Sequence, residues 1–186
     1  MSFSTYARRV RDPALPCRWR VSSFRSCVQL YRPLGMEATL SFVESQAGRY
    51  QRDEAALLRA LEFVEASRTV RRAEFQAYAT RRREAKRQGR RSPRSGETNP
   101  YEQRHWYWYG APKEAALHAL RFWRSRHLPR LAPATDPVLL ELSHCVTEYL
   151  DSREAQRTRL SELEQRLNSW DLVLLIRHIE VASGLR

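Results

Sequence analysis

Glycine is scarce in this chain, with six among 186 residues, and none forms the Gly-rich loop that many nucleotide-binding proteins wrap around phosphates. The sequence also lacks the turn motif that exposes a nucleophilic serine, and no pair of acids comes with a recognisable set of partners. These absences disfavour the enzyme classes that short motifs can reveal. We therefore expect a protein with no catalytic residues.

Long apolar runs and metal-binding motifs are missing as well. The apolar run Leu172–Ile176 is far shorter than the roughly 18 residues that a membrane-spanning helix needs. Cys17, Cys27 and Cys145 are odd in number and have no redox or metal spacing, which predicts reduced thiols. The histidines form no zinc motif, and the adjacent pair of His144 with Cys145 more often reflects helix packing, so we expect no metal site.

Arginine supplies nearly all of the positive charge. Only Lys86 and Lys113 are lysines among 33 basic residues, and the formal net charge is +12. Arginine pairs bidentately with carboxylates and phosphates, which predicts an acidic partner: nucleic acid, anionic lipid or an acidic protein. A base composition that favours arginine codons would explain the same bias.

The charge is unevenly distributed along the chain. Residues 1–130 carry +15, whereas residues 131–186 hold nine acids and six arginines, a net of −3. This asymmetry indicates that the two parts face different surroundings. The densest basic block offers a candidate surface for anionic partners, made of Arg81, Arg82, Arg83, Lys86 and Arg87.

The first residues, Met1–Arg9, are rich in arginine and serine and poor in acids, as in an organelle transit peptide. This composition predicts a mitochondrial address carried by a basic arm over residues 1–29. A disordered basic arm without targeting function is the alternative.

Apolar spacings of three and four predict helices throughout, with no sustained alternation of the kind that strands show. Pro33 suits the first turn of a helix over Leu34–Gln46, and Gly48 would end it. Asp53 is placed to cap a second helix that runs into the basic block, and Pro112 opens a third. We therefore expect an all-α protein with a three-helix core over residues 30–130.

The last third, residues 131–186, is predicted to form a long amphipathic extension. Asp136 and Pro137 make a helix start, and apolar residues then recur in a coiled-coil pattern interrupted at Arg153 and Gln156. A continuous helix over residues 137–182 would be roughly 70 Å long. A hairpin of two helices broken near Asp151–Ser152 is the alternative.

The aromatic cluster Tyr101–Tyr109 is dense enough to require burial. Such clusters fill a helix bundle or a subunit interface more often than they stack on bases, although the interleaved arginine permits stacking.

A short motif near the amino terminus resembles a known family. Gln29-Leu30-Tyr31-Arg32, followed by Thr39-Leu40-Ser41-Phe42, is similar to the signature of the LYR-motif family of small mitochondrial proteins. The nearest likeness is to the accessory subunits of this family in the membrane arm of respiratory complex I. Pro33 and Gly35 depart from the pattern, because they stand where the family continues an unbroken helix.

The resemblance implies a three-helix fold and a partner, a mitochondrial acyl carrier protein. It also implies that Leu30, Tyr31, Arg32 and Phe42 form the partner-binding site, with the acylated phosphopantetheine of the carrier as the only cofactor involved. An acidic carrier helix would meet Arg32, and the acyl chain would enter the apolar core. The expected protein is a non-catalytic accessory subunit beside the inner membrane, on its matrix side.

Two other assemblies fit the same composition. A mitochondrial ribosomal protein would use its arginine blocks to bind ribosomal RNA, because neutralised phosphates release counterions. A structural subunit of another inner-membrane complex, such as ATP synthase, would have nearly the same sequence.

Overall fold

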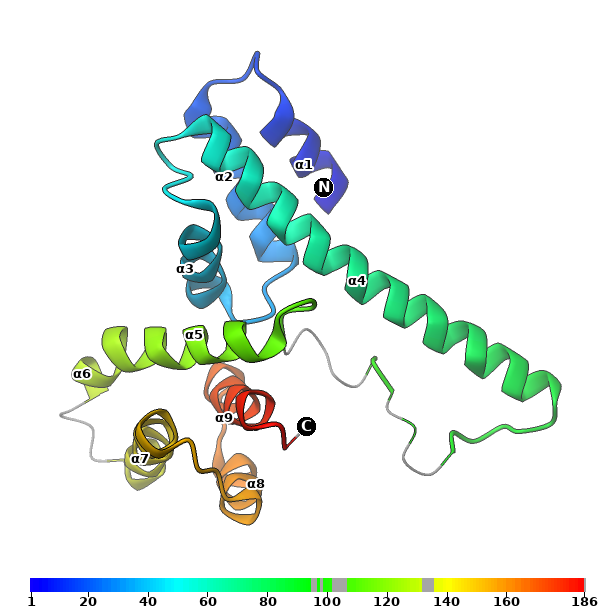
Figure 1. The fold of residues 1–186 in the computed structure, drawn as a ribbon, viewed down its shortest axis with the longest axis vertical. Helices are drawn as coiled ribbons and strands as arrows, with labels where there is room; N and C mark the ends of the chain where they lie inside the picture. The colour runs from blue at the N-terminus through cyan, green and yellow to red at the C-terminus, as the bar shows by residue number, and fades with distance from the viewer. Residues whose placement is uncertain (95–96, 98, 102–106, 132–135, 186) are drawn as a thin grey trace.

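The computed structural model describes residues 1–94, 97, 99–101, 107–131 and 136–185. All regular structure in these residues is helical and no strand occurs among them, which confirms the all-α class. Figure 1 shows the arrangement. The helices are α1 (Phe3–Arg11), α2 (Cys17–Leu30), α3 (Met36–Ala47), α4 (Glu54–Arg87), α5 (Pro112–Arg126), α6 (Leu128–Leu131), α7 (Pro137–Ser152), α8 (Arg157–Arg166) and α9 (Trp170–Ser183).

The predicted basic arm over residues 1–29 is wrong, because this segment folds into α1 and α2. Phe3, Ala7 and Val10 recur at helical spacing, and all three are buried in the main core. Arg20 is buried too, and it donates hydrogen bonds to the Val10 carbonyl oxygen at 2.7 Å and to the Glu54 carboxylate at 2.6 Å. The apolar face of α1 therefore belongs to the core, while its arginines face outward.

The helix expected to start at Pro33 starts instead at Met36. Residues 31–35 form a turn, in which the Gly35 amide donates to the Arg32 carbonyl oxygen at 3.2 Å. Gly35 has φ +84°, a left-handed conformation that glycine adopts without penalty. The helix ends at Gly48 as predicted, also at positive φ.

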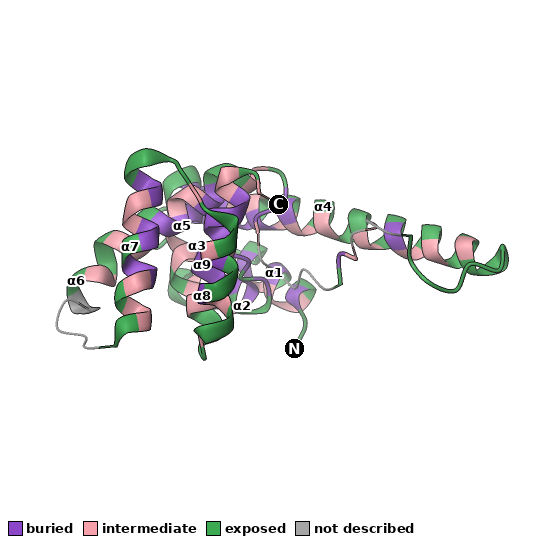
Figure 2. Cartoon of the chain, turned by 90° about the horizontal axis from the view of Figure 1, so that it is seen from below, coloured by how far each residue is buried: buried purple, intermediate pink, exposed green. Residues whose placement is uncertain are grey.

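The second predicted helix is confirmed as α4, the longest helix of the described chain. The Asp53 side chain caps it by accepting a hydrogen bond from the Ala55 amide at 2.9 Å. At 1.5 Å per residue its 34 residues span about 51 Å. Its first half lies against the other helices, whereas its second half projects beyond them, mostly exposed (Figures 1 and 2).

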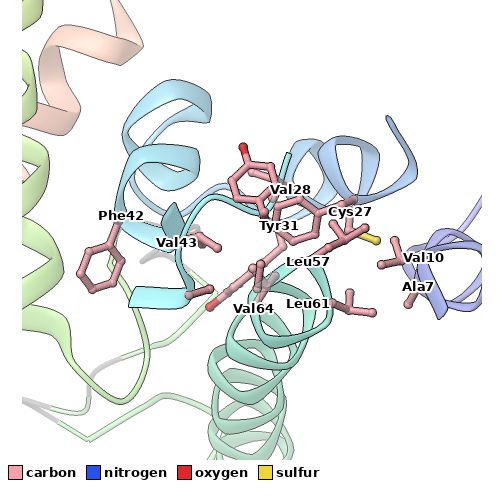
Figure 3. Close-up of a cluster of buried hydrophobic side chains, with 14 of the residues drawn as sticks. Ala7, Val10, Cys27, Val28, Tyr31, Phe42, Val43, Leu57, Leu61 and Val64 are labelled. Carbon is pink, nitrogen blue, oxygen red and sulfur yellow. The ribbon is translucent and has the colours of Figure 1, made fainter. Parts of the chain in front are cut away.

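The main core lies between α1, α2, α3 and the first half of α4 (Figure 3). Leu57, Leu61 and Val64 of α4 supply one wall and are fully buried. Each such side chain stabilises the fold by about 1.5–3 kcal/mol relative to leaving it in water. The predicted three-helix core is therefore enlarged by α1 and α2, and the specific three-helix bundle is not confirmed.

The predicted single helix over residues 137–182 is wrong, and so is the two-helix hairpin. The chain does break near the expected place, at Arg153, which caps α7 with φ +65°. It breaks again after α8, giving three helices. A single long helix would leave its apolar stripe in water, whereas the folded arrangement buries Leu142, Leu163 and Ile176 against one another.

Helix α5 connects the two halves of the molecule. It starts at Pro112 as predicted, with Ala115 and Ala119 in the main core and Leu120 in the core of the last third. Helix α9 packs extensively along it. As a result, the last third is packed on the rest of the protein and does not extend from it.

Candidate functional site

The Leu30-Tyr31-Arg32 tripeptide lies at the end of α2, and its three side chains have different surroundings. Leu30 is the last residue of the helix and is 48% exposed, while Tyr31 is 1% exposed and Arg32 lies at the surface. Leu30 and Arg32 are thus available to a partner. Tyr31 is not, and its expected role in direct contact is contradicted by its burial.

Tyr31 holds α2 against the middle of α4. Its backbone amide donates to the carbonyl oxygens of Cys27 and Val28, and its hydroxyl lies 2.8 Å from the Ser67 Oγ. The guanidinium of Arg71 stands 5.9 Å from the centre of its ring. Burial raises the pKa of Tyr31 to about 12, so the hydroxyl stays protonated.

Phe42 is also buried, at the edge of the core nearest α5 (Figure 3). Its ring centre lies 5.2 Å from that of Trp108 and 5.3 Å from that of His118. Burial lowers the pKa of His118, whose Nε2 lies 3.0 Å from the Ser41 hydroxyl. The space beside Phe42 is therefore filled by the rings of Trp108, Phe63 and His118.

Trp108 packs against the predicted site residues, although the motif does not include it. Its ring stacks on Phe63 at 4.7 Å between centres and approaches Tyr31 at 6.3 Å, so it joins the two buried residues of the predicted site. Burial of the aromatic cluster was predicted, and it holds for Trp108 and Tyr109. Tyr101 is exposed, and residues 102–106 lie outside the described residues.

Two adjoining hollows open beside Arg32, between the turn before α3 and the start of α9. The outer hollow, about 350 Å³, is lined by Leu30, Arg32 and Trp170 among others. The inner hollow, about 320 Å³, reaches between α3, α5 and α9. Trp170 is 51% exposed, and the lining of the outer hollow combines the apolar side chains of Leu30, Trp170 and Leu174 with two opposite charges, Arg32 and Asp171.

The basic block lies at the far end of α4. Arg82 donates to the carbonyl oxygens of Ser92 and Arg91, at 3.1 and 2.6 Å, and so ties the following loop back to the helix. The remaining members of the block are exposed: Arg81, Arg83, Lys86 and Arg87. We call residues 70–94 the basic α4 segment; its ten basic and two acidic residues carry +8 of the total charge of +12.

No group of three or more side chains able to hold a metal ion occurs within the ranges that the structure covers. Cys27 is buried, and burial raises its thiol pKa to about 12, which leaves it protonated and unreactive. None of the helices in the described ranges is long and apolar enough to span a bilayer.

Comparison with known proteins gives no relatives. No protein-family model, curated protein or solved structure matches the chain.

Proposed function

We propose that this chain is a non-catalytic accessory subunit of a mitochondrial inner-membrane complex, respiratory complex I, and that it docks an acyl carrier protein on the matrix side. The observation that supports this proposal is the placement of Arg32. It lies at the surface beside exposed Leu30, and no ion pair is recorded for it in the described part of the chain. An acidic helix of a carrier would supply the missing anion and cover the apolar neighbour.

The buried residues of the motif have a positioning role in this proposal. Tyr31 is fixed by Ser67, and the turn that follows places Arg32 at the rim of the hollows. Phe42 is buried against Trp108. An acylated phosphopantetheine would have space in the outer hollow, which Leu30 and Trp170 line.

The test is binding of the chain to a purified mitochondrial acyl carrier protein. Arg32→Glu places like charges together, and a close charge pair in an interface is worth roughly 1.5 kcal/mol or more, so binding should weaken at least tenfold. Arg25→Glu is the matched control, because Arg25 is an exposed arginine of α2 that lines neither hollow. Equal binding by both variants would refute carrier docking at Arg32.

A second candidate is a mitochondrial ribosomal protein, and the basic α4 segment favours it. Two thirds of the net charge project on one helix and its loop, away from the acidic last third (Figure 1). That distance removes the repulsion from RNA that the acidic segment would otherwise cause. We see no observation that favours a subunit of ATP synthase.

The ribosomal candidate predicts RNA binding that falls steeply with salt. Replacing Arg81, Arg83 and Lys86 with glutamine should reduce both the affinity and the salt dependence, while Arg82 still holds the loop. If this triple variant and the natural chain bind ribosomal RNA equally weakly, the ribosomal candidate is wrong.

A further inference from the structure

The inner hollow lies where three helices from both halves of the molecule meet. Its wall is mainly apolar, formed by Leu34 before α3, Phe122 and Trp123 of α5, and Leu174 and Leu175 of α9. A volume of about 320 Å³ is at the lower end of the range for small-molecule sites. The hollow is therefore large enough for one molecule with a ring or a branched chain.

Two opposite charges stand at its mouth and do not pair with each other. Arg32 and Asp171 both line the inner and the outer hollow, and both are exposed. No ion pair joins them, or either of them to a third residue, in the part of the chain that the structure describes. The other carboxylate at the mouth, Glu37, faces His127 at 3.7 Å.

The start of α3 adds hydrogen-bond donors beside Arg32. This helix of 12 residues begins at Met36, and its N-cap residue, Gly35, has no side chain to cap it, so the amides of its first turn have no acceptor within the helix. Gly35, Met36 and Ala38 line the inner hollow. A carboxylate at this position would meet both the guanidinium and the positive end of the helix.

The floor of the hollow holds an unmatched polar group. His178 lines it and is 1% exposed, and neither ring nitrogen has a hydrogen-bond partner among the described residues. Burial lowers the pKa of His178 to about 4, so the ring is neutral. The Leu34 backbone raises the pKa of His178 and so offsets part of the effect of burial, although its geometry is not that of a hydrogen bond. A buried polar group left without a partner is costly, so a ligand that reaches the floor would gain affinity by supplying one.

We propose that the inner hollow binds a free α-amino acid with an aromatic side chain. The carboxylate lies against Arg32 and the start of α3, and the ammonium group lies against Asp171. The ring packs between Leu34, Leu174 and Trp123 and points toward His178. A zwitterion is favoured over a simple anion or cation, because only a zwitterion satisfies both unpaired charges at the mouth.

This proposal stands on the residues of the hollow and does not depend on the proposed function. Arg32 lines the inner hollow and also belongs to the proposed carrier surface, so a bound amino acid and a docked carrier would compete for it. The tests below use the full chain alone, without carrier or RNA. A negative result would remove the amino acid site and leave carrier docking untouched.

The first experiment is isothermal titration calorimetry with four probes. L-Phenylalanine carries both charges and the ring, 3-phenylpropanoate lacks the ammonium group, phenethylamine lacks the carboxylate, and glycine lacks the ring. L-Phenylalanine should bind, each single-charge analogue should bind about tenfold more weakly or worse, and glycine should give no signal. Absence of binding by L-phenylalanine, or equal binding by the three phenyl compounds, would overturn the proposal.

Variants at the mouth of the hollow provide the second experiment. Arg32→Gln and Asp171→Asn should each weaken L-phenylalanine binding by about tenfold or more, because each removes one charge-assisted contact. Arg25→Gln and Glu162→Gln are the matched controls, since both residues are exposed and line neither hollow. Unchanged binding by the two mouth variants, with circular dichroism showing that they are folded, would contradict the assignment.

The third experiment tests the floor. L-Tyrosine should bind more tightly than L-phenylalanine to the natural chain, because its hydroxyl can pair with His178. His178→Leu should abolish this preference and raise the Tm of the empty protein, since it removes an unpaired buried polar group. Weaker binding of L-tyrosine than of L-phenylalanine to the natural chain would contradict the orientation and overturn the proposal.

Discussion

The Tyr31 hydroxyl lies 2.8 Å from the Ser67 Oγ, and both side chains are sealed from water. This pair joins the end of α2 to the middle of α4, across 36 positions of sequence. The central tyrosine of the tripeptide is thus a structural residue. The turn that follows it sets where Arg32 reaches the surface.

The Tyr31–Ser67 pair should behave as a coupled unit in stability measurements. Tyr31→Phe and Ser67→Ala each remove the contact between the two hydroxyls, so each should lower the free energy of unfolding by roughly 0.5–1.5 kcal/mol. The double variant should cost less than the sum of the two. Urea unfolding followed by circular dichroism measures all three, and strict additivity would show that the two hydroxyls do not interact.

Trp108 should be the most costly tryptophan to truncate among those described. Its ring contacts Phe63, Phe42 and Tyr31, and it is 2% exposed, so Trp108→Ala should lower the free energy of unfolding by roughly 3–5 kcal/mol. Trp19→Ala is the control, because Trp19 is 48% exposed. Its effect should stay within about 0.5 kcal/mol. Equal losses for the two variants would contradict the central position of Trp108.

Stability should fall as the pH is lowered from about 6.5, partly because of His178. Its pKa in the folded protein is about 4, below the ordinary value of 6.5. Between these values the unfolded chain binds more protons than the folded one, so acid favours unfolding. The contribution between pH 6.5 and 5 is roughly 1.5 kcal/mol.

The measurement is urea unfolding at several pH values between 5 and 7. His178→Leu should flatten the profile relative to that of the natural chain. The lowered pKa of His118 acts in the same direction, so some slope should remain in His178→Leu. An unchanged slope in that variant would show that His178 is not buried in its neutral form.

Local signals in the sequence predicted four helix boundaries correctly. Asp53 and Asp136 cap helices through their own side chains, Pro112 stands in a first turn, and Gly48 ends a helix at positive φ. Each of these effects involves residues within one helical turn. The physical cause is therefore contained in the neighbouring sequence.

Tertiary packing was harder to predict. The arginines of α1 suggested a solvated arm, but the spacing of Phe3, Ala7 and Val10 buries one face of that helix. The coiled-coil spacing after Asp136 is compatible with one helix or several, and the two breaks depend on what the apolar residues meet. The position of Trp108 was also hard to predict, because its contact with Tyr31 joins residues far apart in the chain.

The candidate site was predicted only in part for the same reason. The tripeptide and the downstream Phe42 drew attention to four residues without indicating which of them are buried. Leu30 and Arg32 are exposed, whereas Tyr31 and Phe42 are not. The hollows that adjoin Arg32 require α9, which is more than 130 positions away, so no local motif could reveal them.

The most direct test of carrier docking is to identify the proteins and RNA that co-purify with the tagged chain in mild detergent. We expect an acyl carrier protein together with subunits of complex I. We also expect Arg32→Glu to release the carrier and Arg25→Glu to retain it. Recovery of ribosomal RNA and ribosomal proteins, or a carrier signal that Arg32→Glu leaves unchanged, would contradict carrier docking.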